Sequence, residues 1–529
     1  MTNKLDHKFW NYGLILIILT LGIFFRFVNL DKKVYWHDEV YTKLHIAGYT
    51  YNEWQPVLFN GQIQSIENLQ KYQRLTPQKG LYDTLKSLAI DDPHHPPFYY
   101  IICRFWVQQF GNSITTIRSL SACLSLLALP AIYWLCLELF SSQSVGEVAV
   151  CLLAISPLFV LYAQEAREYS LLIVIILVSS GAFLRAIRLT SSTSHTILSW
   201  GLYTLTLIMG LYTSLTTLLL ILIQGLYLLI REPIRLTQTG ISYLISVIAS
   251  GLIFLPWIIV LITNYEKYQS ANLWMKFIKI PSRLLFEFLG LNISRIFVDL
   301  GGEFENPLIW VVMGIILIVV GWGLWILYRT TSVKIWGFIF TLISVPILSL
   351  LLPDLLWGGV RSLSSRYLFF SWLGILLTVA YLLTTLAHQK RKIWPVMATI
   401  VFSAGIISCA VNAQSNTSWM KVISYSLPQV ANIINQSSNP LLVGNQSSYN
   451  PGNLIALSYL LKPEAKFQLL SDEKTYIIPK GYRNIFLLSP SEQLSEKLEK
   501  SAGVKLEFVL GDNHLWLWKV KFLGLTPFK

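Results

Sequence analysis

Two adjacent acids, Asp38 and Glu39, follow the first long apolar run of the chain, from residue 10 to about residue 30. That run is long enough to cross a bilayer, which takes roughly 20 apolar residues, so the acids lie where the chain leaves the membrane. A carboxylate at this interface could act as a general base that takes the proton of an acceptor hydroxyl or amine. The alternative is a solvated pair of loop acids, and the spacing alone does not decide between the two.

A second group of charges, Glu165, Arg167 and Glu168, lies at the outer end of a later apolar run. Ionisable residues at membrane depth are functional candidates, because their burial is costly. Glu165 is therefore a candidate for a second catalytic carboxylate, and Arg167 could brace Glu165 or bind a phosphate group. The alternative is a short turn with ordinary interfacial charges.

Two arginines, Arg361 and Arg366, are predicted on the outer side of the membrane, where arginine near a span is disfavoured. An anionic partner could compensate, and a guanidinium pairs well with the oxygens of a lipid phosphate. Arg366 and the adjacent Tyr367 are therefore candidates for binding the substrate. Contact with lipid headgroups is the alternative, and it applies more to Arg361.

His94 and His95 follow Asp91 and Asp92, which together offer imidazole and carboxylate ligands for a metal ion. The alternative is a turn that leads into a helix begun by prolines. We expect no metal, and His95 instead as a hydrogen-bonding wall of a substrate pocket.

The composition is that of a polytopic membrane protein. The 529 residues are 54% hydrophobic and only 13% charged, and the mean hydropathy is +0.53. A soluble chain would carry about a quarter charged residues. The net charge of +13 is spread over many loops, which argues against a nucleic-acid partner. None of the five cysteines forms a C-x-x-C pair, so neither a zinc site nor a disulfide framework is indicated.

Apolar runs predict about eleven membrane helices. Basic residues in alternate short loops place the N-terminus in the cytoplasm, and an odd number of spans then places the C-terminal segment outside. The runs cover residues 10–30, 114–140, 145–161, 169–188, 196–213, 214–230, 239–263, 306–328, 335–352, 366–387 and 394–412.

Three large pieces are predicted outside the membrane. The first is the loop 31–113, with an interfacial helix at about 96–106, and the second is the loop 264–305, with membrane-surface elements at 273–286. The third is the tail, in which five strand patterns alternate with two helix patterns and predict a small α/β domain. The strand patterns cover residues 440–444, 466–470, 484–488, 505–510 and 515–520, and the helix patterns cover 453–461 and 492–500. We therefore divide the chain into a catalytic membrane domain, 1–412, and an extracytoplasmic domain, 413–529.

Three short motifs together resemble those of the GT-C glycosyltransferases, in the branch of the protein O-mannosyltransferases and the aminoarabinose transferase of lipid A (glycosyltransferase family 39). Each motif alone is weak, but the three occur in order in the first two outer loops. Glu168 departs from the usual residue before the tyrosine, and the tail lies outside the resemblance. The motifs are Trp36-His37-Asp38-Glu39-x-Tyr41, His95-Pro96-Pro97 and Glu165-Ala166-Arg167-x-Tyr169.

The resemblance implies a GT-C fold and an inverting transfer from a polyprenyl-phosphate sugar on the outer face of the membrane. Asp38 would be the base on the acceptor side, and Glu165 a second carboxylate. Glu39 and Tyr41 would belong to the substrate site, with Glu39 bracing the loop. Such enzymes generally need no nucleotide sugar and no soluble cofactor.

The sequence thus predicts an integral-membrane glycosyltransferase of a bacterial plasma membrane and cell envelope. The acceptor would be a glycolipid, a polymer or a protein. The luminal domain usual in eukaryotic protein O-mannosyltransferases does not occur, which favours a glycolipid or polymer. A flippase for lipid-linked saccharides is the alternative, although the acids gather at one face of the membrane. A non-catalytic assembly subunit, with the tail as its binding module, is a third reading.

Overall fold

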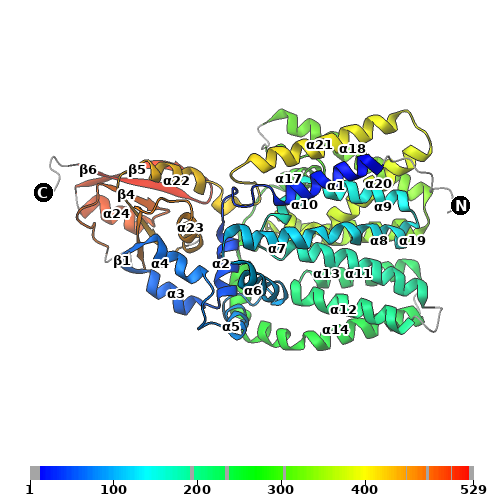
Figure 1. Cartoon of the computed structure of the whole chain (residues 1–529), viewed down its shortest axis with the longest axis horizontal. Coiled ribbons are helices and arrows are strands. Elements are labelled where there is room, and N and C mark those ends of the chain that lie inside the picture. The colour runs from blue at the N-terminus through cyan, green and yellow to red at the C-terminus, as the bar shows by residue number, and fades with distance from the viewer. Residues whose placement is uncertain are drawn as a thin grey trace. The chain divides into compact units, whose positions relative to one another are not determined.

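The computed structural model describes residues 12–190, 196–232, 237–301, 306–447, 449–471, 476–501 and 503–523. They form two compact units, a helical bundle and an α/β unit (Figure 1). The bundle holds the chain up to Leu30, Asp92–Tyr99 and Arg118–Gln414, and the α/β unit holds Asp31–Asp91, Tyr100–Ile117 and the chain from Ser415. Each unit is therefore drawn from several separate stretches of the sequence.

Each of the predicted apolar runs is helical. The helices are α1 (Tyr12–Phe27), α7 (Ile114–Leu126), α8 (Ala128–Phe140), α9 (Gln143–Ala154), α10 (Pro157–Ala163), α11 (Tyr169–Leu189), α12 (Thr196–Thr213), α13 (Thr217–Arg231), α14 (Gln238–Thr263), α18 (Pro307–Thr330), α19 (Val333–Trp357), α20 (Phe369–His388) and α21 (Ile393–Gln414). In the described part of the chain, eight spans are long and apolar enough to cross a membrane, and α9 with α10 forms a ninth candidate, bent by 60°. α1 and α13 are apolar but shorter. The multi-pass helical fold is confirmed, and the number of crossings stays a prediction.

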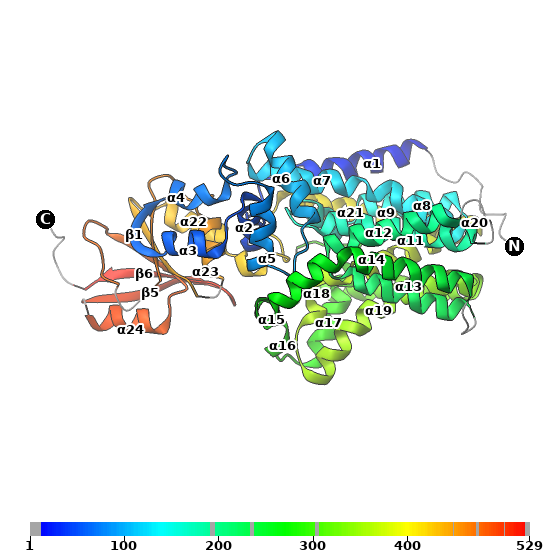
Figure 2. The ribbon, with the colours of Figure 1, turned by 90° about the horizontal axis from the view of Figure 1, so that it is seen from below.

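The burial of the helices separates a bundle centre from a lipid-facing surface. The apolar stretch of α20 is 100% buried and that of α11 is 89% buried, whereas those of α14 and α18 are only 22% buried. The side chains that α14 and α18 expose are large and apolar, such as Leu252 and Ile318. Such surfaces suit hydrocarbon rather than water. α12 packs against both α11 and α14 and lies between them in Figure 1, and Figure 2 shows the same helices from below.

Short helices occupy two connections of the bundle. α15 (Tyr265–Asn272), α16 (Trp274–Phe277) and α17 (Ser282–Ser294) connect α14 to α18, while η2 (Arg361–Leu363) and η3 (Ser365–Leu368) connect α19 to α20. The elements predicted at 273–286 coincide with α16 and the start of α17. Their place at the membrane surface stays a prediction.

The α/β unit contains one six-stranded sheet, in the order β1-β3-β2-β4-β6-β5. The strands are β1 (Asn60–Ser65), β2 (Pro440–Asn445), β3 (Lys466–Leu470), β4 (Asn484–Leu488), β5 (Val504–Gly511) and β6 (Trp516–Phe522). β2 runs parallel to β3 and β4, and the other neighbours are antiparallel. The five strands predicted in the tail are confirmed as β2 to β6. β1 was not predicted, because it comes from the outer loop and pairs with the distant β3.

The two faces of the sheet bury alternate residues of its strands, as the two-residue period of a strand requires. Leu441, Val443 and Leu487 pack on one face against α24 (Glu492–Ser501). Leu442 and Phe486 pack on the other face, in a core that includes α2 (His37–Ala47), α22 (Leu427–Asn435) and α23 (Asn450–Leu457). Outer loop and tail thus share one hydrophobic core within this unit.

The outer loop forms a set of short helices. Beside α2 they are α3 (Tyr51–Leu58), α4 (Ile66–Gln70), η1 (Lys71–Gln73), α5 (Leu81–Asp91) and α6 (Phe98–Phe110), and the tail adds η4 (Val422–Ser424). The helix predicted at 96–106 is confirmed as α6. By contacts, residues 31–91 and 100–117 belong with the tail. The division into functional domains at residue 412 stays a prediction.

Candidate active site

The acidic turn, residues 36–41, begins helix α2. Trp36 is the N-cap in an extended conformation, and Asp38 and Glu39 lie in the first helical turn. The free amides of a helix N-terminus stabilise negative charge there. Successive residues of a helix project about 100° apart, so Glu39 is buried while Asp38 stays partly exposed. One of the two adjacent carboxylates is therefore accessible to a reactant.

Glu39 is held in a buried ion pair. Its carboxylate lies 3.0 Å from the ammonium of Lys421, and the two side chains are 0% and 1% exposed. Lys421 also donates to the carbonyl of Val34 at 2.9 Å and lies over the ring of Trp36. Glu39 is thus placed to brace the loop, and its predicted contact with substrate stays a prediction. No sequence pattern pointed to Lys421, which lies far away in the tail.

Aromatic rings surround the first turn of α2 within the α/β unit. The centroid of the His37 ring lies 4.8 Å from that of Tyr41 and 5.5 Å from that of Tyr449, and Tyr41 lies 5.6 Å from Tyr51. Tyr41 is half-buried among them. Its contact with substrate stays a prediction.

The charged turn, residues 164–168, connects α10 to α11 in the bundle. Pro157 starts α10 at a position where its missing N–H is not needed, after the bend that follows α9. Glu165, Arg167 and Glu168 are 1%, 3% and 4% exposed. Three buried charges in one short turn need mutual compensation. The turn is therefore held by interactions among buried charged groups, and it is not a solvated loop.

Arg167, Glu168 and His95 form a closed network. Arg167 donates from Nη2 to Nε2 of His95 at 2.8 Å, and its Nε lies 3.3 Å from Glu168. Since an arginine can only donate, Nε2 of His95 accepts, so Nδ1 carries the proton. Nδ1 lies 3.3 Å from the second oxygen of Glu168. The network therefore assigns the tautomer of His95.

Electrostatics keeps the members of this network in fixed protonation states. Burial alone would raise the pKa of Glu168, but Arg167 and His95 outweigh it and lower that pKa to about 2. Burial, opposed by Asp92 and reinforced by Arg167, lowers the pKa of His95. Glu168 is thus an anion and His95 a neutral ring at neutral pH, so neither is suited to donate a proton to a leaving group.

Asp92, His94 and His95 offer ligand atoms within 4.8 Å of one another. Nδ1 of His94 lies 2.8 Å from Asp92, and both ring nitrogens of His95 face Arg167 or Glu168. A metal ion would also have to sit beside the guanidinium of Arg167. The three side chains fit a hydrogen-bonded wall better than a metal centre.

Arg366 lies in η3 and meets the end of the charged turn. It donates to the hydroxyl of Tyr169 at 2.9 Å, and its guanidinium lies 5.6 Å from the ring of Tyr367. The guanidinium of Arg167 lies 5.8 Å from the ring of Tyr169. The structure thus places Arg366 beside Tyr169, which lies 197 positions earlier in the sequence and directly follows the charged turn.

Arg361 has a different partner from the one that the sequence suggested. It donates to Asp354 at 2.7 Å, and the other oxygen of Asp354 accepts from the amide and hydroxyl of Ser362. The side chain of Asp354 is 0% exposed. The anion that compensates Arg361 is therefore a residue of this chain, at the end of the preceding helix.

Comparisons with known proteins agree with this geometry. Residues 94–260 match the family of dolichyl-phosphate-mannose-protein mannosyltransferases. The matched stretch contains two of the three motifs, those that begin at His95 and at Glu165. The fold is similar to that of ArnT from Cupriavidus metallidurans bound to undecaprenyl phosphate, with 12% identity and a TM-score of 0.57 over 96% of this chain and 98% of that one. No curated protein sequence matches. The chain therefore resembles the GT-C glycosyltransferases in fold over nearly its whole length, and in sequence over residues 94–260.

A second solved structure has a similar fold. The archaeal oligosaccharyltransferase AglB from Archaeoglobus fulgidus, in complex with an inhibitory peptide and a dolichol-phosphate, matches with 12% identity and a TM-score of 0.51. The match covers 87% of this chain and 64% of that one. The predicted family, fold class and enzyme class are confirmed, and so is the multi-pass membrane character.

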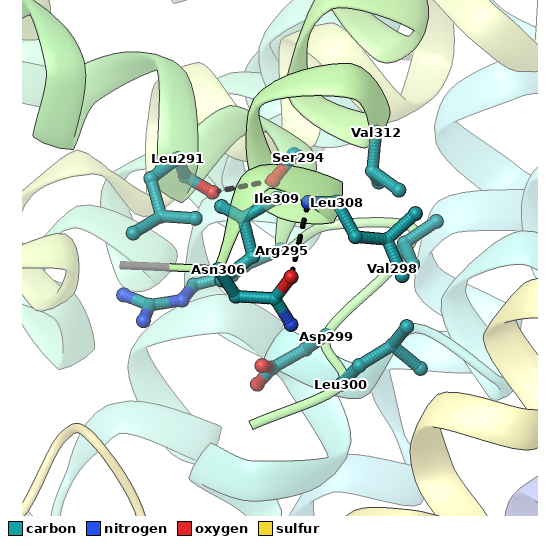
Figure 3. Close-up of a pocket in the computed structure, with 10 residues that line it drawn as sticks. All are labelled: Leu291, Ser294, Arg295, Val298, Asp299, Leu300, Asn306, Leu308, Ile309 and Val312. Atoms are coloured by element: carbon teal, nitrogen blue, oxygen red, sulfur yellow. Dashed lines mark hydrogen bonds between the residues drawn. The ribbon is translucent and has the colours of Figure 1, made fainter. Parts of the chain in front are cut away.

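A pocket elsewhere in the GT-C bundle does not involve the predicted site residues. It lies between α17 and α18, and Leu291, Val298 and Ile309 form part of its apolar wall (Figure 3). Two buried charged residues, Arg295 and Asp299, also line it. The residues that line this pocket do not include those of the charged turn.

Proposed function

We propose that this GT-C glycosyltransferase transfers a sugar from a polyprenyl-phosphate carrier to an acceptor hydroxyl, with inversion, on the extracytoplasmic face. The observation that carries the proposal is the buried charge network of the bundle, which offers guanidinium groups beside a carboxylate at the junction of α10 and α11. Two proteins of similar fold were solved with undecaprenyl phosphate and with a dolichol-phosphate, which supports a carrier of this class.

In the proposed reaction, Asp38 accepts the proton of the acceptor hydroxyl as its oxygen attacks the anomeric carbon. The bond between that carbon and the phosphate oxygen breaks, and the carrier phosphate leaves with the electron pair. Its growing negative charge would be stabilised by Arg366, whose planar fork matches phosphate oxygens. Tyr367, beside it, would border the same headgroup. Glu165 would act as a second carboxylate toward the sugar or the acceptor.

The residues of the charged turn have positioning roles in this proposal. Arg167 is engaged by Glu168 and His95, and these contacts fix its guanidinium near Tyr169. A group held in this way meets a substrate without reorganisation, which is the condition for efficient electrostatic stabilisation. His95 would form part of the pocket wall.

We further propose a bacterial plasma membrane as the location, with a cytoplasmic N-terminus and an extracytoplasmic tail. The support is the basic residues at the ends of alternate helices, such as Arg188, Arg231, Arg329 and Lys390. The acceptor would be a glycolipid or an envelope polymer, with a protein as the alternative.

The first test is the release of free polyprenyl phosphate from a radiolabelled polyprenyl-phosphate sugar by purified protein, with and without a crude envelope extract. We expect release that depends on the extract, and the labelled product then identifies the acceptor. Donor that crosses the bilayer of proteoliposomes without any release would contradict the proposal and favour a flippase. Neither the family match nor the fold supports that alternative.

The proposal includes no metal. We expect that dialysis against EDTA leaves the release unchanged. A loss that a divalent cation restores would instead assign a metal to Asp92, His94 and His95.

A further inference from the structure

The acidic turn is fastened at several points to one segment of the tail, residues 416–424. The amide of Val34 donates to the carbonyl of Asn416 at 2.7 Å, and Lys421 donates back to the carbonyl of Val34. Lys421 also forms the ion pair with Glu39. The backbone of Val34, before Asp38, and the side chain of Glu39, after it, are therefore both bonded to the same short segment.

The N-terminus of α2 is capped by this segment. Trp36 occupies the N-cap position but forms no side-chain cap, and the amide of His37 instead donates to the hydroxyl of Ser424 at 3.2 Å. Ser424 donates in turn to Asn453 at 2.7 Å. A cap normally comes from the residue at the start of the helix. In this case a residue 387 positions later satisfies the first free amide.

The side chains that form these contacts are buried. Lys421 is 1% exposed, and Glu39 and Ser424 are 0% exposed. A buried ion pair contributes little net stability compared with apolar side chains of the same size, but breaking one partner is costly. The pair is therefore better suited to fixing one arrangement of the turn than to stabilising the fold.

We propose that Lys421 and Ser424 are positioning residues for the glycosyl transfer, and that they hold the first turn of α2 so that the Asp38 carboxylate meets the acceptor. The proposal rests on the proposed function of Asp38. A displacement of about 1 Å in a reacting group can lower the rate about 100-fold. The tail thus takes part in catalysis through the turn that it holds.

The test compares Lys421→Met and Ser424→Ala with matched changes elsewhere in the tail. Ser491→Ala removes the serine cap of α24, and Lys497→Met removes a lysine that donates to the Tyr476 carbonyl. We expect kcat to fall about 100-fold in Lys421→Met and about tenfold in Ser424→Ala, with KM for the lipid donor within twofold of wild type. Both controls keep the wild-type kcat.

Lys421→Met leaves a buried charge on Glu39, so the double variant Glu39→Gln/Lys421→Met separates folding from positioning. We expect the double variant to regain the thermal unfolding midpoint but not kcat. Full kcat in the folded double variant would overturn the role of the ion pair, and full kcat in Ser424→Ala would overturn the role of the cap.

Amide hydrogen exchange of the peptide 34–41 gives a readout that does not depend on turnover. We expect faster exchange there in Lys421→Met and Ser424→Ala, and unchanged exchange in both controls. Unchanged exchange in the two test variants would overturn the proposal. A wild-type protein with normal protection but no acceptor-dependent release would contradict the proposed function instead.

Discussion

The acidic turn and the charged turn arrange their charges in different ways. In the acidic turn, Glu39 is buried against Lys421 while the neighbouring Asp38 stays partly exposed. In the charged turn, Glu165, Arg167 and Glu168 are all buried. The first turn thus separates a structural acid from an accessible one, whereas the second couples structure and electrostatics in the same side chains. Substitution of Asp38 should therefore change activity without changing stability, whereas substitutions in the charged turn should often change both.

The largest effect is expected for Arg167→Leu. This change leaves Glu168 buried without its main partner, which should lower the free energy of unfolding by about 3–5 kcal/mol and abolish turnover. The measurement is the thermal unfolding midpoint of purified protein, beside Arg188→Leu. Arg188 pairs with Glu138 but is 57% exposed, so its loss should cost less than about 1 kcal/mol. Equal midpoints for the two variants would show that the charged turn is not an electrostatic network.

Glu165→Gln and Glu168→Gln should separate the two acids of the charged turn. We expect Glu165→Gln to lower kcat about 100-fold with little change in the unfolding midpoint, because a neutral amide replaces a costly buried charge. Glu168→Gln should lower the midpoint, because Glu168 holds Arg167 and His95. The two measurements are acceptor-dependent release and thermal unfolding. A lower midpoint in Glu165→Gln, together with a lower kcat but an unchanged midpoint in Glu168→Gln, would exchange the roles of the two acids.

A smaller effect is expected for Arg366→Lys, which keeps the charge but loses the planar fork. KM for the lipid donor should rise about tenfold and kcat should also fall, since the contact weakens both with the bound phosphate and with the negative charge that grows on it. The matched control is Arg361→Lys, because Arg361 is paired with Asp354 and should change stability rather than KM. The measurement is the release rate of both variants as a function of the lipid donor concentration. An unchanged KM in Arg366→Lys would show that Arg366 does not bind the phosphate.

A further prediction concerns the pH dependence of stability. Burial and the nearby Arg74 lower the pKa of Lys43 to about 8 from its usual 10.5. Between these values the unfolded chain binds more protons at this group than the folded protein does, so its contribution to stability rises with pH. Lys43→Met should remove that rise, seen as a difference in unfolding midpoints between pH 8 and pH 10.5. The exposed Lys500→Met serves as control, and parallel curves for wild type and Lys43→Met would contradict the assignment.

The sequence predicted what depends on local pattern. Apolar length located the membrane helices, and short apolar runs located five strands of the tail. The motifs pointed to Asp38, Glu165 and His95, whose roles stay predictions. What it missed depends on contacts between distant residues: β1 pairs with β3, Asp354 neutralises Arg361, and Lys421 neutralises Glu39. Single charged residues carry no signal for a distant partner, so only the folded chain shows these pairings.

The most direct test of the account compares wild type with Asp38→Asn in single-turnover release of polyprenyl phosphate, with donor binding measured on the same samples. We expect Asp38→Asn to bind donor normally, to unfold at the wild-type midpoint and to release phosphate at least about 100-fold more slowly, because a general base contributes that much. Near-normal release by folded Asp38→Asn would contradict the assignment of the base, and with it the proposed mechanism.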